Sequence, residues 1–398
     1  MTNDTALTTG RRFGIVTALG LVTILTFGSS YYLSAIVAKD IAAEMAWPLA
    51  WVVGGMAVGS LTAGLVSPRT GKLIAVHGGR KTMAGGCFVL GLGLALLGMS
   101  VNLPSFIAAW MVIGVGMSGS LYNAAFSALG RIFGDKARPA ISTVTLYGGF
   151  ASTVCWPLST LLLETYGWRS VCFTYAAIHV AISVPLILFG LPAEASAPVR
   201  PQTTGETVEP EVRPVHAWAF PILAIISVGC EILAAAMAVH LISLLTERGY
   251  SLAFAVSMGM LLGPAQVGAR LIEMVVGRKF HPIWTLLASV GLTASGLTLL
   301  LVDLPIPGAA LIVYGAGNGI WSIARGTLPL ALFGKDRYPI VMGRLARPGL
   351  LAQAAAPTII AVILANTGAV PTLALLTVIG ALNVLLAVGL AKLTKTAT

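Results

Sequence analysis

The stretch TGKLIAVHGGRKT, residues 70–82, combines glycines with lysine and arginine and lies between long apolar segments. A phosphate-binding P-loop has the pattern G-x-x-x-x-G-K-[ST] at the start of a helix. Here six residues separate Gly71 from Gly78, and no acidic strand of the Walker-B kind follows. The spacing therefore argues against a nucleotide site, and the basic character of the stretch needs another explanation.

The composition is that of an integral membrane protein. Of the 398 residues, 57% are hydrophobic and 10% are charged, with a mean hydropathy of +0.91. Soluble domains carry about 25% charged residues, so this chain has too few charges to cover a water-facing surface. The net charge of +10 then reflects membrane topology rather than nucleic-acid binding. The polar start MTNDTALTTGRR, followed by a long apolar run, does not fit a cleavable signal peptide.

The cysteines do not suggest a metal site. All four fall within apolar runs without C-x-x-C spacing: Cys87, Cys155, Cys172 and Cys230. Buried cysteine ordinarily behaves as a small hydrophobic side chain. We therefore expect no metal site and no cofactor.

The apolar segments predict an all-α membrane protein with twelve spans, since about 20 apolar residues cross a bilayer as a helix. The predicted spans are 13–37, 47–67, 83–100, 105–130, 140–163, 170–191, 217–243, 252–273, 282–302, 306–332, 339–364 and 370–391. One long connection, 192–216, is rich in Pro, Glu and Thr, which is typical of a flexible linker. It predicts two six-helix bundles, residues 1–191 and 217–398, joined by a cytoplasmic linker.

The basic residues set the expected orientation. With the N-terminus inside, twenty of the 24 Lys and Arg residues lie in or beside inner loops and three lie in outer loops. Because cytoplasmic loops carry the excess of Lys and Arg, both termini are expected in the cytoplasm, with the protein in the cytoplasmic (inner) membrane. The basic stretch 70–82 then lies in a cytoplasmic loop between the second and third spans.

The two predicted bundles also repeat each other. A shift of 200 residues superimposes Gly119 on Gly319, Phe133-Gly134 on Phe333-Gly334, Pro139 on Pro339, Gly149 on Gly349 and Pro157 on Pro357. Two pseudo-symmetric repeats with a site between them at the membrane midplane are a secondary-transporter architecture.

Over essentially its full length the chain resembles the major facilitator superfamily (MFS). Gly71, Leu73, Gly78 and Arg80-Lys81 are similar to the family's G-x-L-x-D-x-x-G-x-R loop, which the resemblance implies takes part in gating. The stretch GWRSVCF, 167–173, is similar to the family's G-W-R-x-x-F signature.

One departure concerns the acidic residue of that loop. The family's acid falls on Ala75, whereas the second repeat, GARLIE, carries Glu273 near the matching place together with Arg270. We therefore expect the charge relay of the gate in the C-terminal half, with Arg270 and Glu273 as gating residues. Snorkelling or interhelical bracing by Arg270 is one alternative, and a local ion pair between these two residues, three apart on one helix, is another.

The loop entry SPRTGKLIAVHGGR and the stretch MAWPLAWVVGG resemble the monocarboxylate and oxalate/formate branch of the family. That branch implies small organic anions, coupled to protons or exchanged for another anion. The G-P-x-x-G-G run of drug exporters does not occur in the fifth span, which disfavours a drug antiporter without excluding it.

Charged residues inside spans are the main functional signal, because such a charge costs roughly 2.5–3.5 kcal/mol even on the lenient insertion scale. Glu231 lies near the middle of span 7 and Arg325 in span 10. A carboxylate that alternates between neutral and charged forms suits proton coupling, while packing as a permanently protonated group is the alternative. The guanidinium stays charged and matches a substrate carboxylate bidentately. Pairing with Glu231 or reaching the cytoplasmic interface are the alternatives for Arg325.

The resemblance implies that helices 1, 4, 7 and 10 line the cavity. The polar and aromatic candidates for substrate binding on these helices, beside Arg325, are Tyr31, Tyr122, Asn123, Asn318 and Trp321. Such groups give orientation and hydrogen bonds in an otherwise apolar pocket, although each alone is more often a packing residue.

Together these features predict a secondary active carrier for a small organic solute, with an organic anion favoured. The alternatives are an exporter of amphipathic drugs or toxic compounds and an importer of an aromatic, vitamin-like solute. No catalytic motif such as H-E-x-x-H or G-x-S-x-G occurs, so an enzyme is not expected, while a receptor that keeps the fold without transport stays open. The expected partners are the solute and the lipid bilayer, with the protein as a monomer.

Overall fold

The computed structural model describes residues 8–193, 216–302 and 306–395, and they form helices with no strand among them. In the first half these helices are α1 Thr9–Ser29, α2 Leu33–Met45, α3 Leu49–His77, α4 Gly79–Gly98, α5 Leu103–Ser120, α6 Tyr122–Phe133, α7 Arg138–Gly149, α8 Ala151–Tyr166, α9 Trp168–Ile178 and α10 Val184–Gly190. The second half contains α11 Ala219–Thr246, α12 Leu252–Gly259, α13 Leu262–Val276, α14 Pro282–Leu301, α15 Pro307–Thr367 and α16 Ala369–Lys395. Short turns of other helix types lie at Gly134–Lys136, His179–Ser183 and Gly277–Lys279. Most of the predicted linker, 192–216, lies outside the described residues.

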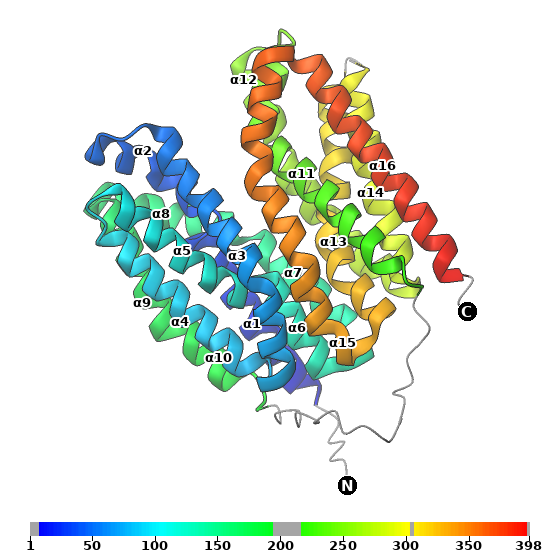
Figure 1. The fold of residues 1–398 in the computed structure, drawn as a ribbon, viewed down its shortest axis with the longest axis horizontal. Coiled ribbons are helices and arrows are strands. Elements are labelled where there is room, and N and C mark those ends of the chain that lie inside the picture. Colours follow the sequence, from blue (N-terminus) through cyan, green and yellow to red (C-terminus); the bar gives the residue numbers. More distant parts are fainter. Residues whose placement is uncertain (1–7, 194–215, 303–305, 396–398) are drawn as a thin grey trace.

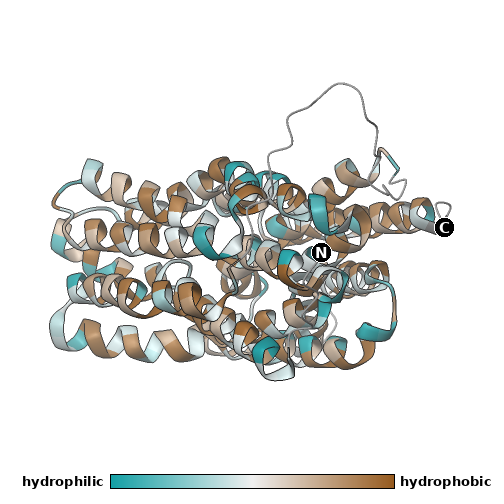
Figure 2. Cartoon of the chain, turned by 90° about the horizontal axis from the view of Figure 1, so that it is seen from below, coloured by the Kyte–Doolittle hydropathy of each residue, from teal (hydrophilic) through white to brown (hydrophobic). Residues whose placement is uncertain are grey.

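The helices match the predicted spans once the breaks within them are counted. Eleven segments of the described chain are long and apolar enough to cross a membrane. One of them, α15, joins two spans across Gly334, whose φ of 72° is not helical. The count of twelve crossings follows, and the apolar residues exposed along the helices (Figure 2) form the surface expected to face lipid.

Several spans consist of two helices instead of one. The first span changes from α1 to α2 over residues 30–32, and the fourth changes from α5 to α6 at Leu121, whose backbone is extended. Such interruptions within the membrane are tolerated where the freed backbone groups find partners inside the protein. The break at residues 30–32 brings Tyr31 to a point where the helix axis changes.

The predicted loop 70–82 is not a loop. Helix α3 continues to His77, and α4 begins at Gly79, so only Gly78 interrupts the two helices, with a φ of 85°. A positive φ costs glycine little because it has no Cβ, and one such residue reverses the chain direction. The expectation of a loop was wrong because the predicted spans counted only apolar residues, whereas both helices continue beyond the apolar segments.

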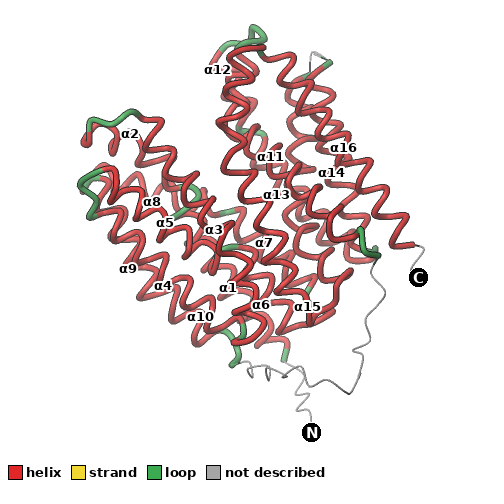
Figure 3. The backbone as a smooth tube through the Cα atoms, in the orientation of Figure 1, coloured by secondary structure: helices red, strands yellow, loops and turns green. Residues whose placement is uncertain are grey.

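The two halves stand side by side and meet mainly at one end (Figures 1 and 3). We call the end at which α1 begins and α16 ends the terminal end, and the opposite end, with α2 and α12, the far end. At the terminal end, one apolar core joins residues of the first half with Leu330, Tyr338 and Met342 of α15. At the far end, α2 packs mainly on α3, α8 and α9, while α12 packs on α11 and α15. The described structure is therefore closed between the halves at the terminal end.

Glycine allows the closest approach of the halves. A Cβ on Gly71 of α3 would lie 2.4 Å from the carbonyl oxygen of Pro339 and 3.1 Å from the Cα of Gly343, both on α15. Backbones pack this closely only where side chains are absent.

Candidate functional site

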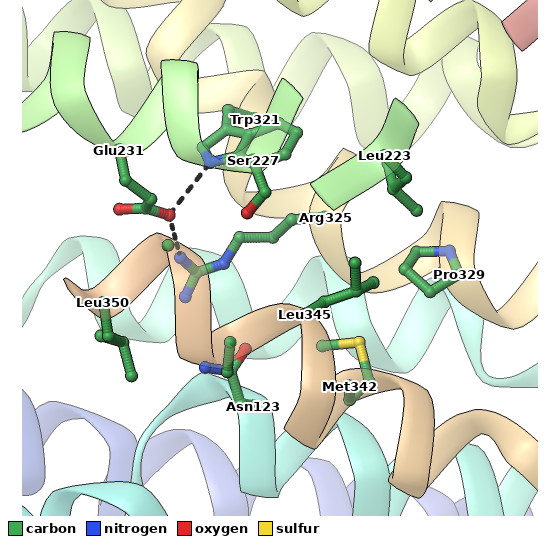
Figure 4. A pocket seen from close by; sticks show the side chains of 12 residues that line it. Asn123, Leu223, Ser227, Glu231, Trp321, Arg325, Pro329, Met342, Leu345 and Leu350 are labelled. Atoms are coloured by element: carbon green, nitrogen blue, oxygen red, sulfur yellow. Dashed lines mark hydrogen bonds and ion pairs between the residues drawn. The ribbon is translucent and has the colours of Figure 1, made fainter. Parts of the chain in front are cut away.

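The centre of the candidate site is Glu231, near the middle of α11. Its side chain is buried, and its Oε1 accepts hydrogen bonds from Arg325 Nη1 at 2.9 Å and from Trp321 Nε1 at 3.3 Å (Figure 4). Trp321 and Arg325 lie four residues apart on α15, so both side chains project from the same face of the helix. The structure therefore joins α11 and α15 through a charge-assisted pair inside the membrane.

Arg325 keeps hydrogen-bonding capacity that Glu231 does not use. Within the described residues its Nε is buried without a hydrogen-bond partner, and the contact to Glu231 runs through Nη1 alone. Its Cζ lies 5.4 Å from the centre of the Tyr122 ring of the first half, a cation–π distance. Since a guanidinium carries five N–H donors, the arrangement leaves donors available for a further acceptor.

A small cavity of about 30 Å³ opens beside this pair, with lining residues from both halves. The lining consists of Asn123, Leu223, Ser227, Glu231, Trp321, Arg325, Pro329, Met342, Leu345, Ala346, Gly349 and Leu350. Figure 4 shows Arg325 between Glu231 and Asn123, which comes from the first half. Pockets for organic ligands measure about 300–1,000 Å³, so the site is contracted in this conformation.

The predicted binding residues do not all reach this cavity. Asn123, Trp321 and Arg325 line it, together with the predicted coupling residue Glu231. The Tyr122 hydroxyl donates to the Thr145 carbonyl oxygen at 3.2 Å, while its ring contacts Arg325.

The remaining two candidates lie away from the lining. Tyr31 accepts a hydrogen bond from Gln353 of α15, which bridges the halves. Asn318 is partly buried on α15, one turn from Trp321, and does not line the cavity.

Residues that the sequence did not single out also contribute. Ser227 and Met342 line the cavity, and Gln353 contacts Tyr31. Gln353 is a polar residue in a predicted span, which is a signal that could have identified it, whereas serine and methionine are too common in apolar helices to stand out. Within the described residues, no group of three His, Cys, Asp or Glu side chains could hold a metal ion.

The predicted gating residues other than Arg270 lie in two places toward the terminal end. Gly71 packs against α15, and Gly78 separates α3 from α4, as described above. Arg80 is partly buried and Lys81 is exposed. At Ala75, where the family pattern has an acid, the backbone carbonyl accepts a hydrogen bond from Arg131 of α6. The arginine therefore donates to a backbone carbonyl oxygen here, where the family pattern has a carboxylate.

The second place joins α7 to α13. Arg138 Nη2 lies 3.0 Å from Glu273 Oε1, 2.7 Å from the Gly277 carbonyl oxygen and 3.0 Å from Thr285 Oγ1. Thr285 also donates to the Glu273 carboxylate at 2.8 Å, and Arg138 Nη1 donates to the Phe280 carbonyl oxygen. One arginine of the first half therefore holds the end of α13 in the second half.

Arg270 does not pair with Glu273. Its Nε donates to the Gly319 carbonyl oxygen and its Nη1 to the Thr145 carbonyl oxygen, each at 3.1 Å. The alternative of a local ion pair is wrong because α13 turns both residues toward partners on other helices. Arg270 thus bridges the halves through Thr145, while the acid is held by Arg138.

The comparisons with known proteins agree with this architecture. The sequence profile of the Major Facilitator Superfamily matches residues 18–346. Among curated proteins, none matches the chain significantly.

Similar solved structures include the human organic anion transporter MFSD10 (TETRAN), with a TM-score of 0.72 and 16% identity over 96% of this chain and 100% of that chain. The proton:xylose symporter XylE bound to 6-bromo-6-deoxy-D-glucose has a TM-score of 0.73 and 12% identity, over 96% of each chain. FucP in the outward conformation has a TM-score of 0.73 and 12% identity, over 94% of this chain and 98% of that chain. At these identities the likeness concerns the fold.

The family profile covers most of the chain, and the chain has the twelve-helix architecture of these transporters. The chain therefore belongs to the Major Facilitator Superfamily, whose members carry small molecules across membranes and are not enzymes.

Proposed function

We propose that this protein is a secondary active carrier that moves a small organic anion by alternating access, with Arg325 as the anion ligand and Glu231 as the coupling residue. The observation that carries this proposal is the buried Glu231–Arg325 pair at 2.9 Å beside a cavity to which both halves contribute. A site between two repeats near the midplane is the place where such carriers bind their solutes.

The chemistry of the pair favours an anion. Arg325 stays charged in every state, and it has donors that Glu231 leaves unused. Asn123 and Ser227 add an amide and a hydroxyl to the same cavity. A carboxylate of the solute can take the place of Glu231 on the guanidinium, with these two groups as further hydrogen-bond partners.

Coupling to protons follows from the replacement of Glu231 by the solute carboxylate on Arg325. While Glu231 is ionised, it neutralises Arg325 in the closed cavity. When a proton neutralises Glu231, Arg325 loses its partner and needs an external anion, because an unpaired buried charge is unfavourable. Proton and organic anion then bind together, which gives symport, and exchange of one anion for another proceeds on the same ligand.

Gating is proposed at the terminal end. Arg138 with Glu273 joins the halves there, and Gly71 allows α3 to approach α15. Arg270 joins the halves deeper in the molecule, at the Thr145 carbonyl that also accepts from Tyr122. Rocking of the halves must break these contacts to open that end. Gly78, Arg80 and Lys81 lie at the junction of α3 and α4 and move with this interface.

The distribution of Lys and Arg supports an orientation with both termini in the cytoplasm, and we propose the cytoplasmic (inner) membrane as the location. In that orientation the closed terminal end faces the cytoplasm. We propose a division into residues 1–191, a cytoplasmic linker 192–216 and residues 217–398, with the carrier acting as a monomer.

A second solute class is favoured by one observation. The rings of Phe27, Tyr31, Tyr32 and Trp156 form a chain of contacts on the first half, with centroid separations of 6.0 to 6.1 Å. Aromatic rings of this kind suit an aromatic solute, as in the vitamin-like alternative, or the apolar body of an amphipathic compound. An aromatic carboxylate satisfies both this cluster and Arg325. The monocarboxylate-like branch stays a prediction.

The test is thermal stabilisation of the purified protein by three groups of compounds, namely small and aromatic carboxylates, neutral aromatic solutes and lipophilic cations. We expect carboxylates to stabilise the unmodified protein and Arg344→Ala, but not Arg325→Ala. Arg344 is the matched control, since it is an exposed arginine on the same α15. Stabilisation by neutral aromatics or cations alone shows that the solute is not an anion, and makes Glu231 the residue to test next.

A further inference from the structure

A groove lies on the outer surface of the first half, away from the interface between the two halves. A groove of about 470 Å³ runs between α1 and α10 at the terminal end, with Arg11 at one end and Leu21 at the other. Its walls include Phe13 and Phe189, whose side chains are 70% and 86% exposed. The groove therefore opens on the outer, apolar surface and is separate from the cavity at Arg325.

Two glycines shape the groove, since Gly14 borders open space and Gly190 allows α10 to pack closely on α1. A Cβ on Gly14 would meet no atom within 4 Å, and a Cβ on Gly190 would lie 2.8 Å from the Cβ of Ala18. Both glycines line the groove, and a larger side chain at Gly14 would occupy part of its space.

The length of the groove matches one leaflet of a bilayer. Arg11 and Leu21 are ten residues apart on α1, which corresponds to about 15 Å at the rise of an α-helix. The hydrocarbon core of a bilayer is about 30 Å thick, so one leaflet supplies about half of that. An acyl chain that begins at the level of Arg11 therefore ends near Leu21.

The charge at the entrance selects the headgroup. In the described part of the chain, Arg11 and its neighbour Arg12 form no ion pair, and both are exposed at the start of α1. A guanidinium binds a phosphate group bidentately. Basic pockets between membrane helices on the cytoplasmic side bind anionic headgroups.

We propose that this groove binds an anionic phospholipid of the leaflet at the terminal end. The lipid phosphate contacts Arg11, and one acyl chain lies between Phe13 and Phe189 over Gly14. The site is independent of the proposed transport function, because none of its lining residues belongs to the Glu231–Arg325 cavity.

The experiment is native mass spectrometry of the full-length, delipidated protein with phosphatidylglycerol and, separately, phosphatidylcholine of the same chain length. Gly14→Leu fills the groove, and Gly10→Leu is its matched control, since a Cβ at Gly10 also meets no atom within 4 Å but this residue does not line the groove. Arg11→Gln removes the headgroup contact, and Arg12→Gln removes an equal charge that is not part of the lining.

We expect phosphatidylglycerol to bind better than phosphatidylcholine. Arg11→Gln should weaken the binding of phosphatidylglycerol by about fivefold, because one basic residue near an anionic surface contributes about 1 kcal/mol. Gly14→Leu should abolish the bound lipid, and both controls should retain it. Equal binding of the two lipids, or equal effects of Gly14→Leu and Gly10→Leu, overturns the proposal.

Two other occupants give different outcomes. If glycerol phosphate alone binds as well as the lipid, the site recognises a free phosphate. If cleavage of the 192–216 segment by a glutamate-specific protease, at Glu194, Glu206 or Glu211, is needed before lipid binds, that segment fills the groove. Either result contradicts the lipid assignment.

Discussion

The contact between Arg138 and Glu273 offers the sharpest test of how the halves are held at the terminal end. Their side chains are 15% and 6% exposed, and the carboxylate oxygen lies 3.0 Å from Arg138 Nη2 and 2.8 Å from Thr285 Oγ1. Glu273→Gln keeps the shape of the side chain and a carbonyl acceptor for Thr285. The substitution removes the charge on which the bond from Arg138 depends.

The expected magnitude follows from this geometry. A hydrogen bond to a charged group contributes about 1.5–3 kcal/mol, and in the proposed mechanism the pair breaks when the terminal end opens. Its loss therefore destabilises the closed terminal end relative to the open one by about this amount. At about 1.4 kcal/mol for each factor of ten, the ratio of the two conformations shifts by about tenfold to 150-fold. The double variant Arg138→Gln/Glu273→Gln should shift the ratio further than Glu273→Gln alone, because it also removes the bonds from Arg138 to the carbonyl oxygens of Gly277 and Phe280.

The assay is the distance between spin labels at the far end, on Lys39→Cys of α2 and Glu247→Cys beside α11, both at exposed positions. The four native cysteines are buried and are not labelled. Glu273→Gln should shift the distance distribution toward shorter far-end separations, since opening the terminal end closes the far end. The control is Lys136→Gln, which removes an exposed charge two residues before Arg138 in the same half. An unchanged distribution in Glu273→Gln, or an equal shift in the control, refutes the role of the pair in closing this end.

Two further predictions concern coupling and packing. Glu231→Gln should retain exchange of labelled anion in proteoliposomes but lose accumulation driven by a proton gradient, because the amide cannot carry the proton. With one proton per anion, a gradient of one pH unit gives up to about tenfold accumulation, and this ratio should fall to one, whereas retained accumulation places the coupling elsewhere. Gly71→Ala should open the terminal end, since its Cβ would lie 2.4 Å from the Pro339 carbonyl oxygen, and overpacking costs about 1–3 kcal/mol. Gly85→Ala, where a Cβ meets nothing within 4 Å, is the control for the same far-end distance measurement, and equal distances in the two variants contradict the prediction.

Much of the site could be predicted from the sequence, because charged residues are rare in membrane spans. Glu231 and Arg325 stand out in apolar segments, and each had to find a partner or water. The candidates that do not line the cavity, Tyr31, Tyr122 and Asn318, show the limit of this reasoning. A polar residue on a cavity helix faces the cavity only if the rotation and breaks of that helix bring it there.

The sequence by itself determined the number of spans, the helical class and the duplicated halves. The length of each hydrophobic segment and the 200-residue repeat can be read along the chain without knowledge of its packing. A helix in lipid also forms its backbone hydrogen bonds within itself. The same reasoning placed a loop at residues 70–82 where α3 and α4 continue to either side of Gly78, because the ends of helices depend on cap and packing geometry.

Only the tertiary structure decided which charges meet. Glu273 pairs with Arg138, 135 residues away, and not with Arg270 three residues before it. Arg325 meets Glu231 because α11 and α15 pack face to face, and the halves close at the terminal end because Gly71 lets α3 approach α15. These contacts depend on the relative rotation and distance of helices far apart in the chain, which hydropathy and spacing along the sequence do not encode.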